Sequence, residues 1–398
     1  MKFNYLILIS FFLLAVVFSL RSETANYTVH YELTKMNEYT YVITRNWDQE
    51  GKRRNNIGMV IGEQGITLIN GMFGREIDQL LALIRTVSDK PIKYVFNSNW
   101  DFHNTDANQK LNELGATIIS HHNLLYFAKA KTQLIFKEYL ELELGTDKIL
   151  AYKSGGHSFG HINIYVKNAN VMFMSDSFRD QWMTTPGPYG HEAHIKALEK
   201  ALILGNSDTK FVPGNTSSSV FVESNTIEKE IDIRQTFVSK VLTLENTGLS
   251  VKEISQRSEI KKLFSANYEM YPVWGKDLSG SVRAALYGKR VKDKKMGFKI
   301  AQQYLGQYQL PNGKIIEVTF DNGHLIAKSK HAFMYLLVHH KDDSFEFGWY
   351  AANRFFEFLK DGQGQVTGLR VKMHKEDIRF GQELSLEYLK TVPVAKKI

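Results

Sequence analysis

The chain has 398 residues, a net charge of +8, 13 histidines and no cysteine. This length exceeds what one hydrophobic core usually serves, so we expect two folded domains. The composition, 43% hydrophobic and 23% charged, is that of a globular protein and excludes a disordered or fibrous chain. Without cysteine there are no disulfides, thiolate zinc sites or cysteine nucleophiles, so any metal must be bound by His, Asp, Glu or amide groups. The charge is too moderate for this size to indicate an anionic partner.

The first 22 residues predict a targeting segment. One lysine precedes an apolar run from Leu6 to Val17. The run is shorter than the roughly 20 residues of a membrane span and is typical of a signal-peptide core. We expect cleavage before Leu20 or near Ser22, and an uncleaved N-terminal membrane anchor is the alternative. Both interpretations predict an exported protein, periplasmic or secreted, that contacts a membrane only if the segment is retained.

Residues 23–290 are predicted to form one domain in which strands alternate with helices. This alternation predicts a layered α/β fold. The apolar spacing becomes helical from 226 to 290, where Ser250 and Glu253 form a capping box. The expected strands lie at 41–43, 58–61, 66–69, 92–96, 116–120, 162–166 and 170–174, and the earlier helices at 75–88, 106–114 and 191–204.

The last part of the chain has a different pattern. A basic stretch runs from Lys289 to Lys295, and residues 291–299 are interpreted as a solvated linker, with a patch for an anionic surface as the alternative. Apolar residues then alternate with period two from 300 to 398, and Asp321-Asn322-Gly323 is a hairpin-turn sequence. We therefore expect a small antiparallel β-sheet or barrel with one aromatic face.

A polar loop, Asn97-Ser-Asn-Trp-Asp-Phe-His-Asn104, follows the strand that ends near Phe96. Later come Gly155-Gly-His157, Met174-Ser-Asp176 and Pro213-Gly-Asn215. In these segments, and in this order over roughly residues 28 to 290, the chain resembles the metallo-β-lactamase superfamily. The resemblance implies a four-layer αββα sandwich whose chemistry uses one or two zinc ions held by His and Asp side chains.

The ligand positions implied by the resemblance are largely substituted. The family has His-x-His-x-Asp-His where this chain has Asn, Asp, His and Asn at 99, 101, 103 and 104. Asparagine stands at four degenerate positions: Asn70, Asn99, Asn104 and Asn215. Four side chains remain able to bind a metal: Asp101, His103, His157 and Asp176.

A neutral amide is a poor ligand for zinc compared with imidazole or carboxylate. Asn99, Asn104 and Asn215 would thus remove one ligand from the first metal position and two from the second. We predict a non-hydrolytic or weakly active protein, with no cofactor or one divalent metal, that binds a small molecule or a partner at the former active-site cleft. The alternative is a metal-dependent hydrolase with a rearranged mononuclear site built from the four remaining side chains.

Other candidate sites carry weaker patterns. His191 and His194 are one helical turn apart and resemble half of a metal clamp, although exposed helix histidines are common. The pairs at 121–122 and 339–340 are interpreted as structural or surface histidines. Residues 217–219 could bind an anion through backbone N–H groups or form a plain loop. Basic residues are not interleaved with aromatic ones, so no nucleic-acid partner is expected.

The C-terminal stretch from Tyr304 to Val371 resembles the lipocalin-like domains appended to serine-type β-lactamase and peptidase relatives. The resemblance implies a module that flanks an active site or binds an apolar ligand, and apolar-ligand binding by this domain is a further hypothesis for function. A module that serves only packing and stability is the alternative, since an aromatic sheet face is usually core.

Overall fold

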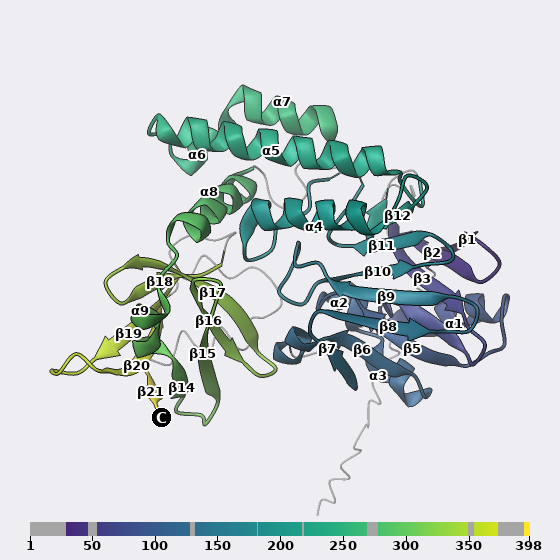
Figure 1. The fold of residues 1–398 in the computed structure, drawn as a ribbon, viewed down its shortest axis with the longest axis horizontal. Coiled ribbons are helices and arrows are strands. Elements are labelled where there is room, and N and C mark those ends of the chain that lie inside the picture. Colours follow the sequence, from purple (N-terminus) through teal and green to yellow (C-terminus); the bar gives the residue numbers. More distant parts are fainter. Residues whose placement is uncertain are drawn as a thin grey trace, which may run out of the picture.

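The computed structural model describes residues 29–46, 54–127, 132–180, 182–216, 219–268, 278–348, 354–372 and 394–398. The predicted targeting segment, residues 1–22, lies outside these ranges. None of the helices in these ranges combines the length and the apolar composition of a membrane span. The described chain forms a sandwich of two sheets with helices outside, a group of further helices, and a closed barrel beside the sandwich (Figure 1).

The first sheet takes most of its strands from the N-terminal part of the chain. Its strands are β1 (Tyr31–Lys35), β2 (Thr40–Asn46), β3 (Arg54–Ile61), β4 (Ile66–Ile69), β5 (Ile92–Asn97), β6 (Thr117–His121), β7 (Leu134–Phe136) and β13 (Asn215–Thr216). The helices between them are η1 (Gly74–Glu76), α1 (Ile77–Arg85), α2 (Phe102–Thr105), α3 (Asn108–Glu113) and η2 (His122–Tyr126). β1 to β4 pair antiparallel and β4 to β7 pair parallel, while β13 joins β3. Parallel neighbours need crossover connections, and the α1 and α2–α3 segments supply two of them.

The second sheet follows in the chain. Its elements are β8 (Tyr139–Glu143), β9 (Lys148–Lys153), β10 (Ile162–Val166), β11 (Val171–Ser175), α4 (Gly190–Leu204) and β12 (Lys210–Pro213). The strand order is β12-β11-β10-β9-β8, with β11 and β12 parallel across α4 and the other pairs antiparallel. The predicted strands and the helix at 191–204 are therefore present.

Three buried apolar layers hold the sandwich together. Leu80 of α1 belongs to the layer between the first sheet and its helices. Phe96 of β5 and Phe173 of β11 lie in the layer between the two sheets. Leu198 of α4 packs with Met172 of β11 in the layer outside the second sheet, which α5 (Ser224–Asn246) also covers. This is the four-layer αββα arrangement that was predicted, and Figure 1 shows α4 and α5 on one side of the sheets and α1 and α3 on the other.

A helical segment connects the sandwich to the barrel. It comprises α5, α6 (Val251–Gln256), α7 (Ser258–Asn267) and α8 (Ser279–Asp293), which share one apolar core. The predicted capping box is present at the start of α6, because Ser250 accepts from the backbone N–H of Glu253 and the Glu253 carboxylate accepts from that of Ser250.

The basic stretch is part helix and part exposed connection. Its first residues are the last turns of α8, which ends at Asp293, and α9 (Phe298–Ala301) begins soon afterwards. Three of its cations pair with acids from other elements: Lys289 with Glu245, Arg290 with Glu346, and Lys292 with Glu192. These charges are therefore partly neutralised by neighbouring acids.

The C-terminal strands close into an antiparallel barrel, as the alternating pattern predicted. They are β14 (Gly306–Gln309), β15 (Ile315–Asp321), β16 (His324–Ser329), β17 (Phe333–Lys341), β18 (Ser344–Glu346), β19 (Phe355–Lys360), β20 (Val366–Lys372) and β21 (Ala395–Lys397). The hairpin between β15 and β16 turns at Asn322 and Gly323, whose φ angles are 46° and 86°. Two positive φ values are what a tight type I′ turn requires.

The aromatic face of the barrel points inward and fills it. Tyr304, Phe345 and Phe358 contact one another with ring centroids 4.8 to 5.5 Å apart. Phe347 and Phe356 form a second contact of the same kind, at 4.8 Å. All five side chains are buried. The described part of the interior is therefore a packed aromatic core.

An apolar interface joins the barrel to the sandwich. Phe159, from the loop between β9 and β10, packs in one cluster with Tyr287 and Val291 of α8 and with Ile326 and Leu336 of the barrel. The hydroxyl of Tyr287 donates to the carbonyl of Leu336 at 3.1 Å. The loop that carries Phe159 is thus held between α8 and the barrel wall.

Candidate functional site

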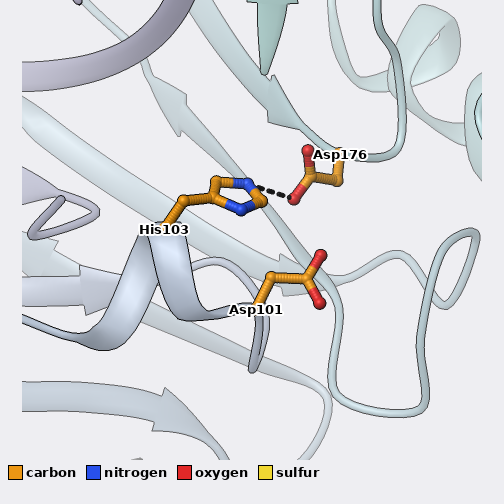
Figure 2. Close-up of side chains that lie close together, drawn as sticks. All are labelled: Asp101, His103 and Asp176. Carbon is orange, nitrogen blue, oxygen red and sulfur yellow. Dashed lines mark hydrogen bonds and ion pairs between the residues drawn. The ribbon is translucent and has the colours of Figure 1, made fainter. Parts of the chain in front are cut away.

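The candidate residues come from three loops at one edge of the sandwich. β5 ends at Asn97, and the polar loop that follows places Asp101 at the start of α2 and His103 within it. Asp176 comes directly after β11. His157 lies in the loop between β9 and β10. Figure 2 shows the His103 side chain pointing from α2 to Asp176, with the Asp101 side chain beside this pair.

The backbone that presents Asp176 depends on a neighbouring glycine. Ser175 has a φ of 46°, which is uncommon for a residue with a side chain. The N–H of Gly214 donates to the Ser175 carbonyl at 2.9 Å. A Cβ at Gly214 would lie 2.5 Å from the Ser175 carbonyl carbon, so only glycine permits this approach. The Pro-Gly segment, expected as a ligand loop, therefore supports the backbone next to Asp176.

Asp176 is fully buried and its carboxylate accepts five hydrogen bonds. Oδ2 accepts from the amides of Asn99 at 2.7 Å and Asn104 at 3.1 Å, and from Nε2 of His103 at 3.0 Å. Oδ1 accepts from Nε and Nη2 of Arg179 at 2.9 and 2.6 Å. Protein donors therefore occupy both oxygens of this carboxylate.

A second acid–histidine pair lies beside the first. Nε2 of His157 lies 3.1 Å from Oδ2 of Asp101, and Nδ1 lies 3.2 Å from the Thr185 carbonyl. The backbone N–H of Asp101 donates to the side-chain oxygen of Asn99, and so does the Asn104 amide. The two pairs thus belong to one hydrogen-bonded cluster that Asn99 and Asn104 connect.

Charge and burial have opposite effects on the pKa values of Asp176 and His103. Burial disfavours the charged carboxylate of Asp176, but the positive charges of Arg179 and His103 outweigh it and hold the pKa of Asp176 well below its usual range. Burial likewise disfavours a charged His103, yet the charge and hydrogen bond of Asp176, with a contribution from Asp101, leave the pKa of His103 above its usual value. Both residues are thereby stabilised in their charged forms.

The remaining asparagines lie outside this set of contacts. Asn70 accepts from the backbone N–H of Ser98 at 2.9 Å and donates to the Ser175 hydroxyl at 3.4 Å, so it braces the residues next to Asn99 and Asp176. Asn215 is in β13 and donates to the Arg54 carbonyl at 3.2 Å. These hydrogen bonds do not involve the carboxylates of Asp101 or Asp176.

The donor set does not fit a pair of zinc ions. Ligand atoms of Asp101, His103 and Asp176 lie within 4.8 Å of one another, the one group of three or more metal-binding side chains found among the described residues. Asn99 and Asn104 turn N–H groups, not lone pairs, towards Asp176. Three side chains could approach one ion only if His103 gave up its bond to Asp176. The resemblance implies one or two zinc ions, whereas the described residues offer one cluster of three side chains that could bind a metal.

Two partners of the cluster were not predicted from the sequence. Arg179 contacts Asp176 at a spacing of three residues, and the opposite charges at this spacing are the one sequence signal that could have indicated the contact. The Thr185 carbonyl that faces His157 has no sequence signal, since any residue supplies a carbonyl. Both come from the loop between β11 and α4.

The helix histidines are not surface groups or half of a clamp. His191 and His194 are 2% and 0% exposed. Nδ1 of His191 lies 3.4 Å from a nitrogen of Arg234, and Nε2 of His194 donates to the Ser177 carbonyl at 2.6 Å. The expectation of exposure is wrong because α4 is covered by α5 and α8, and these histidines have internal partners.

The other candidates are structural or lie outside the described chain. His121 is buried, and its Nδ1 accepts from the backbone of Asn123, in agreement with a structural role. Nε2 of His339 donates to the Asp342 carbonyl in an exposed turn. Residues 217 and 218 of the possible anion loop are not among the described residues.

Comparisons with known proteins cover the two parts of the chain separately. Residues 292–386 match the family described as "Domain of unknown function (DUF3471)". No curated protein matches the chain. Similar solved structures include a metallo-β-lactamase from Pontibacter korlensis, at 16% identity over 52% of this chain and 99% of that one, with a TM-score of 0.47. Others are the metallo-β-lactamase IND-7 (14% identity, 51% and 98% covered, TM-score 0.45) and the DIM-1 metallo-β-lactamase (15%, 52% and 99%, TM-score 0.45). The fold assignment rests on the strand order and the layers described above.

Proposed function

We propose that this chain is an exported, non-hydrolytic protein whose metal site has degenerated, and that it binds a small molecule or a partner over the Asp101–His157 pair. The observation that carries the proposal is the complete hydrogen bonding of Asp176 by protein groups. Hydrolysis in the family that the sequence resembles needs metal ions that activate a water. Here the carboxylate that would serve as a ligand is held by two amides, an imidazole and a guanidinium.

The groups available to a ligand are the partly exposed ones. The side chains of Asp101, His103 and His157 are 20%, 18% and 14% exposed. Phe102, between the first two, is 44% exposed and its ring lies 5.5 Å from that of Phe73. A ligand with a polar group and an adjoining apolar part would match this combination of an acid, two imidazoles and an aromatic surface.

The test is the metal content and hydrolytic activity of the purified mature protein. After exposure to zinc, iron or manganese and dialysis, we expect much less than one metal ion per chain and no turnover of ester, amide or β-lactam substrates. His157→Ala should then leave the metal content unchanged. A stoichiometric metal that disappears in His157→Ala would contradict the proposal. Export is tested separately, by fractionating cells that produce the full-length chain and one that lacks residues 1–22.

A metal-dependent hydrolase with one metal is the second candidate. It is favoured by the proximity of the ligand atoms of Asp101, His103 and Asp176. In this candidate the three side chains would hold one divalent ion, which would supply an activated water. The same metal analysis separates the two candidates, because this one requires a bound ion and loss of turnover in His103→Ala.

A further inference from the structure

The side chain of Arg179 is an internal cation placed against Asp176. It is 8% exposed, and two of its nitrogens donate to the same carboxylate oxygen. The guanidinium carbon lies 5.0 Å from the ring centroid of Trp182, which is itself buried. A buried aromatic face and two charge-assisted hydrogen bonds to one carboxylate oxygen fix the position of this cation.

The charge on Asp176 requires such a partner. A fully buried carboxylate is strongly unfavourable unless a positive charge and hydrogen bonds compensate it. The amides of Asn99 and Asn104 bind Oδ2 but are neutral. His103 is positively charged only while it is protonated. Arg179 therefore supplies the permanent positive charge at this carboxylate.

A divalent ion would compete with this arrangement. Two cations beside one carboxylate repel each other strongly where water is excluded. A metal would have to displace the hydrogen bond of His103 and tolerate the guanidinium on the other oxygen of Asp176. Removal of the guanidinium would leave a buried carboxylate without its permanent counter-charge, beside Asp101 and His103.

We propose that the guanidinium of Arg179 has replaced a metal ion as the counter-charge of Asp176, so that loss of this one side chain allows the cluster to bind a divalent metal. The inference deepens the proposed function of this site and rests on it. In this arrangement the negative charge of Asp176, which a metal ion would otherwise balance, is balanced by a cation from within the chain.

The test compares Arg179→Met with Arg179→Lys, which keeps the charge, and with the double variant Asp176→Asn/Arg179→Met, which removes both charges. Zinc affinity is measured by competition with a chromophoric chelator, and the melting temperature is measured with and without zinc. We expect Arg179→Met to melt lower than the wild type, to recover on addition of zinc, and to bind one zinc at least about a hundredfold more tightly than the wild type. The wild type, Arg179→Lys and the double variant should show no zinc-dependent shift.

Three outcomes overturn the inference. One is an Arg179→Met protein that folds but gains no zinc affinity. Another is an Arg179→Met protein that zinc fails to stabilise or to restore to the folded state, while the double variant folds. The third is Arg179→Lys gaining zinc affinity equal to that of Arg179→Met, since charge would then not be the cause. The proposed function fails on a different result, a stoichiometric metal in the wild type, so the two failures are distinguishable.

Discussion

Asp101 and His157 bind each other across the site, with Nε2 of the imidazole 3.1 Å from Oδ2 of the carboxylate. The other ring nitrogen of His157 faces the Thr185 carbonyl. Both nitrogens of this histidine are therefore engaged with protein oxygens. Two side chains that the sequence resemblance assigns to metal binding instead connect two loops of the sandwich.

The two acids of the cluster should differ in their contribution to stability. Asp176→Asn leaves Arg179 buried without its counter-charge, and we expect it to lower the free energy of unfolding by about 3–5 kcal/mol. Asp101→Asn is the matched control: the Asp101 side chain is 20% exposed with a single ion-pair partner, so we expect a loss of about 1 kcal/mol. Urea denaturation of both variants measures the difference, and equal losses would contradict the view that Asp176 is the buried centre of the cluster.

The contact between the His157 loop and the barrel should be a large stabilising element. Phe159 is buried in the interface with α8 and the barrel, so Phe159→Ala should cost about 3–5 kcal/mol. Phe102→Ala, at a ring that is 44% exposed, should cost about 1 kcal/mol or less.

Hydrogen exchange gives an independent measurement of the same contact. Amides of residues 155–161 should exchange faster in Phe159→Ala than in Phe102→Ala, because the loop loses its attachment to α8 and the barrel. Unchanged protection of this loop in Phe159→Ala would show that the interface does not hold it.

Acid should destabilise the protein partly through His121. Burial, reinforced by the positive charges of His122 and Lys153, lowers the pKa of His121 to about 3. Above a pH of about 6.5 the residue is neutral in both the folded and the unfolded chain, and its stability contribution is fully present. Below that value the unfolded chain takes up a proton that the folded chain does not, so stability falls by about 1.4 kcal/mol for each pH unit until about pH 3.

The measurement is the free energy of unfolding at pH 7 and pH 5. We expect His121→Gln, whose amide oxygen can still accept from the backbone of Asn123, to lose about 2 kcal/mol less than the wild type over this interval. His30→Gln is the control, because the His30 side chain is 75% exposed. If His121→Gln and the wild type show the same pH dependence, burial of His121 is not its cause.

The barrel should bind apolar molecules only after a cavity is created. Phe345→Ala removes a fully buried ring from the aromatic interior and should cost about 3–5 kcal/mol. A small apolar probe such as benzene should then raise the melting temperature of this variant and not that of the wild type. Phe298→Ala, at a ring that is 57% exposed, should respond as the wild type does. A wild-type response to benzene would instead revive the hypothesis of an apolar ligand.

The architecture was predictable because its signals are local. The apolar spacing of Leu80 and its neighbours marks α1, and Asn322-Gly323 marks the first barrel hairpin, without reference to any distant residue. The strand that ends near Phe96 and the polar loop after it are likewise marked by consecutive residues.

The contacts within the site were not predictable, since they join distant parts of the chain. Asp101 meets His157 and His103 meets Asp176 across loops that no spacing rule connects. The burial of His191 depends on Arg234 from α5, which supplies its polar partner. In each case the packing of helices and sheets determines which residue becomes the partner. No local pattern in a single sequence indicates this packing.

The interface around Phe159 also has a consequence for how the protein is made. The N-terminal sandwich emerges from the ribosome well before the barrel strands that cover this ring, and domains generally fold in order of synthesis. Until the strands that carry Ile326 and Leu336 have been synthesised and folded, the Phe159 side chain lacks part of its packing surface. The loop with His157 would therefore reach its final position only once the last hundred or so residues have folded against it, so a chain truncated before the barrel would expose a hydrophobic surface at the very edge where ligand recognition is proposed.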